Sequence, residues 1–200
     1  LGINSVMPST LAELGERKST RVYEIAIPRI FAVFFNVTKN AALAHDEIRS
    51  ALAFATDRDA IIKEVLLGKG QSAETAVLPF MEGYAADVAF PRFDEGRANA
   101  LLDENGWQRG EDSIRSKQGT VFEFELLVPD WPELVKTAEM LRDQWGKVGA
   151  RVTVSVLSAA DLQQNAVRPR EYQALLFGEA AMLHSDPYSF WHSSQKHDPG

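Results

Sequence analysis

Residues 121–128 read VFEFELLV, and this short stretch decides the fold class. Its large apolar side chains fall at every second position, with Glu123 and Glu125 between them, which is typical of a β-strand with two unlike faces. A helical stripe follows and ends at Gly149; its apolar members are Leu134, Ala138, Leu141, Trp145 and Val148. The two patterns predict a strand and then a long amphipathic helix.

The same alternation of strand and helix continues to residue 177. Residues 152–156 predict a second strand, a capping box at Ser158 and Asp161 begins a short helix, and residues 172–177 predict a third strand. Strands that are joined by helices at this spacing pair in parallel through right-handed crossovers. We therefore predict an α/β lobe built on a βαβαβ unit, with a mixed sheet flanked by helices.

The first half of the chain predicts one more strand and further helices. Residues 30–37, IFAVFFNV, form a dense β-branched and aromatic run that indicates a buried strand. Residues 46–68 predict two short helices or one bent helix, and residues 94–104 predict another. The residues placed to cap helix starts are Asp46, then Thr56 or Asp57 at the second helix, and further on Asp94 and Asp130. The polar stretch 108–120 predicts a turn or a short hairpin.

The composition fits an ordinary globular domain and excludes several classes of protein. The 200 residues carry a net charge of −7, which argues against a nucleic-acid partner and against binding to anionic membranes. No cysteine is present, so disulfides, cysteine zinc sites and thiol nucleophiles are excluded. No apolar run approaches the roughly 18 residues of a membrane-spanning helix, and no signal peptide is visible. Because the chain opens on Leu1 and ends on a stretch that completes no element, we expect a fragment of a longer protein.

Residues 48–61, IRSALAFATDRDAI, resemble a signature of a known protein family. In the extracellular solute-binding proteins of family 5, which serve peptide, opine and nickel ABC importers, the pattern reads roughly V-R-x-A-hydrophobic-x-x-A-hydrophobic-D-R-x-x-I. Asn36 resembles the asparagine that this family carries just before the signature helix, and segments 78–79, 83–84 and 100–107 resemble further landmarks. On pattern alone the signature is a buried amphipathic helix, so the resemblance identifies the family without making this helix a binding site.

The resemblance implies a fold and a function. The fold is a two-lobed, type II periplasmic-binding-protein fold, in which residues 30–193 form the lobe that contains the carboxy-terminal half. Residues 1–29 are then a lead-in segment from the region between the lobes, and residues 194–200 a truncated tail. The implied function is the substrate-binding component of an ABC importer, which captures a small polar solute and delivers it to the permease membrane subunits.

The same resemblance sets the expected solute, partners and location. The solute is an oligopeptide, a sugar or a metal chelate, bound in a cleft between the lobes without a cofactor and without catalysis. We expect a monomer that works in the periplasm or outside the cell, with the parent protein associated with the membrane.

A geometric rule predicts that two loops form one wall of the ligand site. In open α/β sheets, ligands lie beyond the carboxyl ends of the strands. The first loop is 129–131, which ends in Trp131, and the second is 178–186, after the third strand. Gly178 would let a backbone approach a ligand closely because it has no Cβ. A surface turn is the plain alternative for the second loop, and a tryptophan beside a helix start is often a packing residue.

The resemblance favours the second loop as a site. Family members carry a hydrophobic strand, a glycine, a loop, then Asp-Pro and an aromatic segment, and residues 174–178, 186–187 and 188–191 match these parts. In members that bind free peptides, an aspartate about four residues after the glycine pairs with the peptide ammonium, whereas Met182 stands at the matching position here. Glu179 replaces a common tryptophan, and we hypothesise that its carboxylate serves a cationic ligand or hydrogen-bonds a sugar or chelate. The candidate ligand-binding residues are Asn36, Trp131, Phe177, Gly178, Glu179, Ala180, Ala181 and Met182.

Catalytic and metal sites are not indicated by the sequence. His184, His192 and His197 lie near acidic residues but match no zinc-binding spacing. There is no G-x-S-x-G, H-E-x-x-H or P-loop motif. A metal- or carboxylate-dependent hydrolase is the alternative function, and it requires converging titratable side chains in one pocket. A purely structural interaction domain is a third possibility, and it would show no crevice at 178–186.

Overall fold

The structure, a computed structural model, describes residues 29–73 and 90–180 without a break. It also describes scattered positions before and between them: 10, 14–17, 19, 21, 23, 75, 77–79, 81, 84–85 and 87. The elements in chain order are β1 (Arg29–Phe35), α2 (Asp46–Phe54), α3 (Arg58–Glu64), α4 (Glu95–Glu104), β2 (Gln108–Arg109), β3 (Arg115–Lys117), β4 (Thr120–Val121), β5 (Glu123–Pro129), α5 (Pro132–Lys147), β6 (Arg151–Leu157), α6 (Ala159–Asp161), the π-helix η1 (Leu162–Val167) and β7 (Ala174–Ala180).

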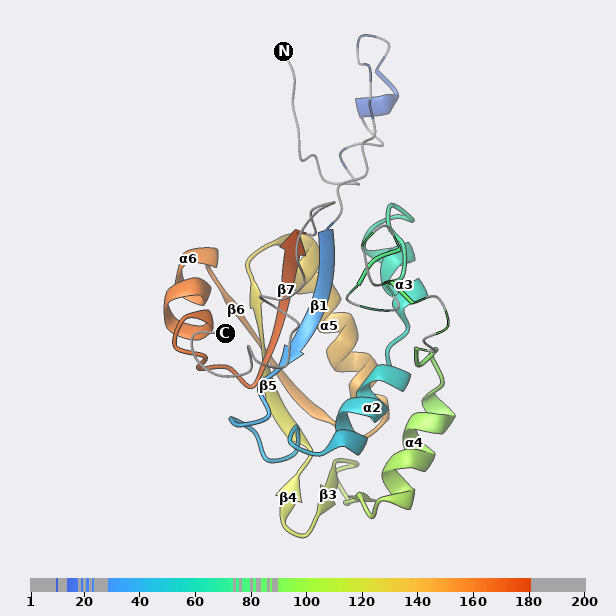
Figure 1. Cartoon of the computed structure of the whole chain (residues 1–200), viewed down its shortest axis with the longest axis vertical. Coiled ribbons are helices and arrows are strands. Elements are labelled where there is room, and N and C mark those ends of the chain that lie inside the picture. Colours follow the sequence, from blue (N-terminus) through green and yellow to red (C-terminus); the bar gives the residue numbers. More distant parts are fainter. Residues whose placement is uncertain are drawn as a thin grey trace.

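The main sheet has the strand order β1-β7-β5-β6 (Figure 1). β5 lies between β6 and β7 and runs parallel to both, so the predicted βαβαβ unit with parallel strands is confirmed. β1 pairs with β7 in the antiparallel direction, from Arg29 opposite Ala180 to Phe35 opposite Ala174. The sheet is therefore mixed, as expected, and the carboxyl ends of β5, β6 and β7 share one edge.

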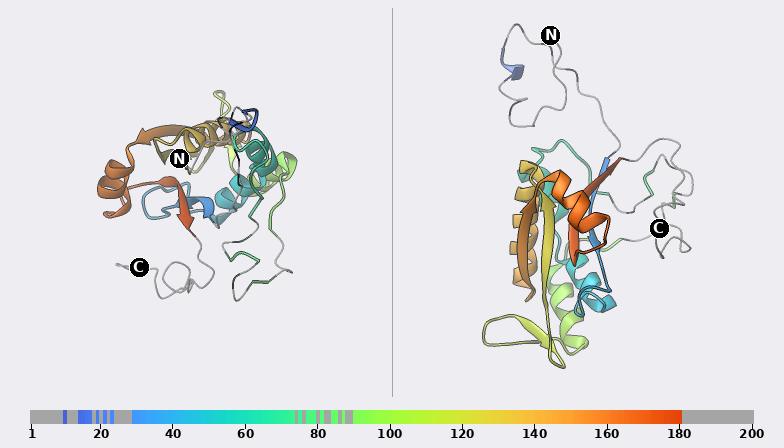
Figure 2. Two further views of the ribbon diagram at one scale, coloured as in Figure 1. Left: turned by 90° about the horizontal axis from the view of Figure 1, so that it is seen from above. Right: turned by 90° about the vertical axis from the view of Figure 1, so that its left-hand side faces the viewer.

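Helices cover the two faces of this sheet to different depths (Figure 2). On one face α5 buries Leu134, Ala138, Leu141 and Trp145 against alternate residues of the strands, and α2 and α4 extend the same core. On the other face η1 buries Leu162 and Ala166 against Leu127 and Leu175. The larger core on the α5 side carries most of the hydrophobic burial that drives folding.

The helix caps confirm part of the sequence reading. Residues 46–68 do form two helices, and Asp57 and Asp94 accept cap bonds from backbone N–H groups three residues on, at 2.9 and 2.8 Å. The prediction that Asp46 and Asp130 cap helices was wrong. The capping positions are His45 and Trp131, and neither makes a side-chain cap bond. No helix among the described residues has both the length and the apolar character needed to cross a membrane.

Two predicted strands differ from those in the structure. β1 is half-buried along most of its length rather than fully buried, because it stands at the end of the strand order. The third strand of the βαβαβ unit continues to Ala180 instead of ending at Phe177. Its extra length is held by continued pairing with β1, including Phe31 opposite Gly178. The turn or hairpin predicted at 108–120 is a small antiparallel sheet, β2-β3-β4.

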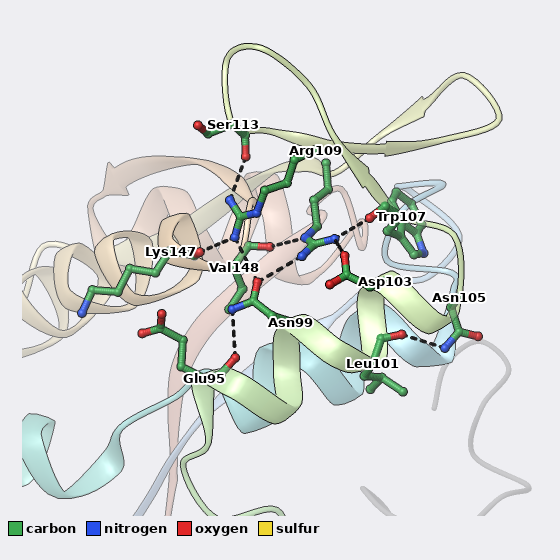
Figure 3. Close-up of polar contacts among 11 residues, drawn as sticks. Glu95, Asn99, Leu101, Asp103, Asn105, Trp107, Arg109, Ser113, Lys147 and Val148 are labelled. Carbon is green, nitrogen blue, oxygen red and sulfur yellow. Dashed lines mark hydrogen bonds and ion pairs between the residues drawn. The ribbon is translucent and has the colours of Figure 1, made fainter.

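A buried arginine joins this small sheet to the lobe. Arg115 is 2% exposed, and its guanidinium donates to the carbonyls of Val148 and Trp107 and to the side chains of Asp103 and Asn99. Figure 3 draws these partners around the end of α4. The hydrogen bond and charge of Arg115 lower the pKa of Asp103 against the opposing effect of burial. We call this group of residues the Arg115 network.

Candidate functional site

The carboxyl ends of three strands meet at one edge of the main sheet. Pro129 of β5 lies opposite Leu157 of β6, and the N–H of Asp130 donates to the Leu157 carbonyl at 2.9 Å. The N–H of Trp131 donates to the Pro129 carbonyl at 2.8 Å, which tightens the turn into α5. We call residues 129–131, 157 and 177–180 the carboxyl-end rim. It corresponds to the top of the sheet in Figure 1, where the arrow of β7 ends.

Two of the sequence-predicted site residues contact each other at this rim. The rings of Trp131 and Phe177 stack with their centroids 6.2 Å apart and their planes 29° from parallel. Trp131 follows β5 and Phe177 lies in β7, so the parallel pairing of these strands brings the rings together although they are far apart in sequence. Trp131 remains 38% exposed.

Gly178 lies inside β7 and not in a loop after it, which corrects the sequence-based expectation. A Cβ at this position would lie 2.6 Å from Cε1 and 2.9 Å from Cδ1 of the Phe31 ring. The missing side chain therefore makes room for the ring of the paired residue on β1. This close approach explains the glycine locally without a ligand.

Asn36 does not join the other candidates. Because β1 runs antiparallel to β7, its end lies beside the start of β7, at the opposite edge of the sheet from the rim. The Asn36 amide donates to the carbonyl of Arg170 at 3.0 Å, and its carbonyl oxygen accepts from the N–H and the hydroxyl of Thr38. These bonds give Asn36 a structural role in joining the end of β1 to the chain before β7.

The remaining candidates lie at or beyond the end of the described chain. The backbones of Glu179 and Ala180 belong to β7 and pair with Ile30 and Arg29. Ala181 and Met182 fall outside the described residues, as do the rest of the predicted loop to residue 186 and the histidines at 184, 192 and 197. Within the part of the chain that is described, no group of three or more His, Asp or Glu side chains is arranged to hold a metal ion.

The sequence reading missed two residues of the rim neighbourhood. Leu157 was not considered, and Phe31 was read as part of a buried strand although its ring is substantially exposed. The signal for Leu157 was its place directly after the predicted second strand. No sequence signal shows that Phe31 lies opposite Gly178, because the register of an antiparallel pair depends on where the two strands meet.

A hollow of about 260 Å³ lies away from the rim. It is bounded by α3, the start of α4 and α5, and its lining includes Asp57, Glu64, Glu95, Asp143 and Phe93. None of the predicted site residues contributes to it. The acidic lining distinguishes this hollow from the Trp131–Phe177 contact at the rim, which is aromatic.

Comparison with known proteins shows the family. The model of the bacterial extracellular solute-binding proteins, family 5 Middle, matches residues 2–199, and the chain belongs to this family. It is similar to the dipeptide-binding protein of Escherichia coli strain K12, with 30% identity over 171 residues, which are 86% of this chain and 30% of that protein. It is also similar to the oligopeptide-binding protein AppA of Bacillus subtilis, with 29% identity over 162 residues, 78% of this chain and 30% of that protein. The chain thus spans about 30% of the length of these relatives.

Solved structures show the same fold, the type II periplasmic-binding-protein fold. The structure of AppA from Bacillus subtilis in complex with a nonapeptide matches with a TM-score of 0.83 and 26% identity, over 94% of this chain and 38% of that chain. NikZ from Campylobacter jejuni in complex with Ni(L-His) matches with a TM-score of 0.82 and 22% identity, over 95% of this chain and 38% of that chain. The second likeness concerns the fold alone.

Proposed function

We propose that this chain supplies one wall of the solute site in the substrate-binding component of an ABC importer. The parent protein captures a small polar solute in a cleft between two lobes and delivers it to the permease membrane subunits. Membership of the family supports this role, and so do relatives that are themselves binding proteins. The observation that carries the proposal is the parallel pairing of β5 with β7, which sets the exits of both strands side by side.

The solute class follows from the relatives by analogy. The relatives bear the names of dipeptide- and oligopeptide-binding proteins, and AppA was solved with a nonapeptide. We propose a peptide-like solute for this chain, ahead of a sugar or a metal chelate. Met182 has no charge to pair with a peptide ammonium. We therefore propose that the α-amine of the solute is not anchored at that position.

Glu179 is the carboxylate we propose in place of that anchor. It follows Gly178 directly, and its backbone lies at the rim. Glu179→Gln in the intact protein removes the charge and keeps the shape. We expect it to weaken binding of a cationic solute by about tenfold, the effect of losing one charged hydrogen bond. Unchanged affinity would remove Glu179 from the site.

A binding role accounts for the rim better than hydrolysis does. Four of the rim residues, Pro129, Leu157, Trp131 and Phe177, carry no group that abstracts or donates a proton in catalysis. Hydrolysis requires a nucleophile or metal ligand set and a base in one pocket. We propose that the protein works as a monomer without a cofactor or nucleic acid, in the periplasm or outside the cell, and associates with the membrane at its permease.

Native mass spectrometry of the intact parent protein tests the function without a prior guess of the solute. We expect a peptide-sized molecule to be carried through purification and to rebind with micromolar or tighter affinity after removal. A pocket needs walls on two sides to bury most of its ligand, so we expect the 200 residues alone to bind the same molecule weakly or not at all. An intact protein that carries no solute and binds none from a peptide library, or that turns a solute over, would contradict the proposal.

A further inference from the structure

The exposed tryptophan at the rim, Trp131, differs from the two tryptophans that are buried among the described residues. Trp107 and Trp145 are 0% and 2% exposed, and their indole N–H groups donate to Glu47 at 3.3 Å and to the Thr56 hydroxyl at 3.0 Å. Trp131 is 38% exposed, and its indole N–H has no hydrogen-bond partner among the described residues. Buried tryptophans that serve packing usually find a partner for this group. Packing therefore accounts for Trp107 and Trp145, but it does not account for the exposure and the indole N–H of Trp131.

The position of Trp131 has no local reason to favour a tryptophan. It occupies the capping position of α5, where serine, threonine, aspartate or asparagine normally accepts a bond from the first turn. No such bond is made here, so the helix start is stabilised by Pro132 in the first turn instead. A large ring at this place brings no gain to the helix itself.

The backbone holds the two rings in a fixed arrangement. The turn below Trp131 is fixed by the bond from the Asp130 N–H to the Leu157 carbonyl, and the Trp131 carbonyl accepts from the N–H of Val135 in α5. Phe177 lies within β7, opposite Ala32 of β1. A surface that is already rigid loses little conformational entropy when a ligand binds to it. The stacked pair is thus held in place by the backbone while Trp131 stays 38% exposed.

We propose that the Trp131–Phe177 pair is an aromatic platform that selects solutes carrying an aromatic side chain. The inference rests on the proposed function and deepens it by naming the class of peptide. The exposed indole stacks on the flat group of the solute, and its N–H, which has no partner among the described residues, donates to an acceptor such as a peptide carbonyl.

Six tripeptides and the intact parent protein test the platform. Three Ala-based tripeptides carry one Phe at the first, second or third position, and three matched ones carry Leu. Calorimetry should show that at one position Phe binds about five- to tenfold more tightly than Leu, the range of one aromatic pair. Trp131→Ala should abolish that preference, and Trp131→Phe should keep most of it.

The control is Phe93→Ala, which removes another exposed ring. Phe93 is 47% exposed and lines the acidic hollow rather than the rim. This variant should keep the full preference for Phe. A preference that survives Trp131→Ala, equal affinity for Phe and Leu at all three positions, or no binding of any tripeptide overturns the inference. The solute identified by native mass spectrometry decides the proposed function independently.

Discussion

The two ends of the main sheet are built in contrasting ways. Near its amino end, the Arg115 network buries a charge and gives it four acceptors from α4, the chain after α4 and the end of α5. At the carboxyl-end rim, Trp131 stacks on Phe177 but stays partly exposed, and its indole N–H has no hydrogen-bond partner among the described residues. Proteins draw their binding surfaces from regions that contribute little to stability. The contrast fits an amino end that holds the lobe together and the proposed role of the rim as one wall of the solute site.

Loss of the buried arginine should have the largest effect on folding. Arg115→Leu leaves the carbonyls of Trp107 and Val148 without their donor, and unsatisfied buried groups are costly. We expect the free energy of unfolding of the intact protein to fall by about 3 kcal/mol, measured by denaturant titration.

The matched control is Arg97→Ala, which breaks an exposed ion pair with Glu104 at 3.5 Å. It should cost less than about 1 kcal/mol, because surface pairs are weak. A loss at Arg115 no larger than the loss at Arg97 would show that the network does not stabilise this end of the sheet.

Substitution of Gly149 should have the next largest effect on stability, because its backbone conformation and its surroundings both exclude a side chain. Its φ is +92°, and a Cβ would lie 2.6 Å from Cγ of Arg115. We expect Gly149→Ala to cost about 2 to 3 kcal/mol. Gly119→Ala is the control, since φ there is +84° but nothing lies within 4 Å of the added Cβ. Only the strain of about 1 kcal/mol should remain at Gly119, and equal losses at both sites would refute the clash with Arg115.

Glu47 gives a smaller effect that depends on pH. Burial opposes ionisation of this carboxylate, but hydrogen bonds from Lys117, its own backbone and Trp107 lower its pKa from 4.5 to about 2. The folded state therefore binds the proton less readily than the unfolded state. The stabilisation from Glu47 is complete above pH 4.5 and is lost as the pH falls towards 2.

The Glu47→Gln variant checks this assignment. It should be less stable than the parent protein at pH 7, and the difference should shrink as the pH falls from about 4.5 to 2. Melting temperatures across that range measure it. A difference that does not change with pH would mean that the charge of Glu47 does not join α2 to β3.

Trp131→Ala should have the smallest effect on stability. That result would sharpen the contrast between the carboxyl-end rim and the Arg115 network. Trp131 is already 38% exposed and makes no cap bond, so we expect its loss to lower the free energy of unfolding by less than about 1 kcal/mol. A loss of 3 kcal/mol or more would show that Trp131 belongs to the core and is not reserved for a ligand.

The sequence predicted the parallel unit well because its patterns are local. The alternation at 121–128 and the helical stripe that ends at Gly149 each report one element, and helices between strands impose parallel pairing. Asp57 and Asp94 capped their helices as expected, since a cap involves only the next few residues. Two of the candidate residues are brought together because Trp131 directly follows β5 and Phe177 lies in β7, the parallel neighbour of β5.

The remaining features depend on contacts that are distant in sequence. Because β1 runs antiparallel to β7, Asn36 lies at the edge of the sheet opposite the rim. No local sequence pattern gives the direction of β1. Gly178 looked like the start of a loop because glycine is usually a breaker, yet it continues a strand under the ring of Phe31. The burial of Arg115 was also missed, although Asn99 and Asp103 stand four residues apart on one face of α4, a spacing that places two partners together.

Hydrogen–deuterium exchange of the intact protein, with and without its copurified solute, tests the central claim most directly. If the carboxyl ends of β5 and β7 form one wall of the site, the solute should slow exchange in peptides covering 129–135 and 177–182 and leave 36–42 unchanged. Slowed exchange confined to 36–42, or no change at either strand exit, would contradict the claim.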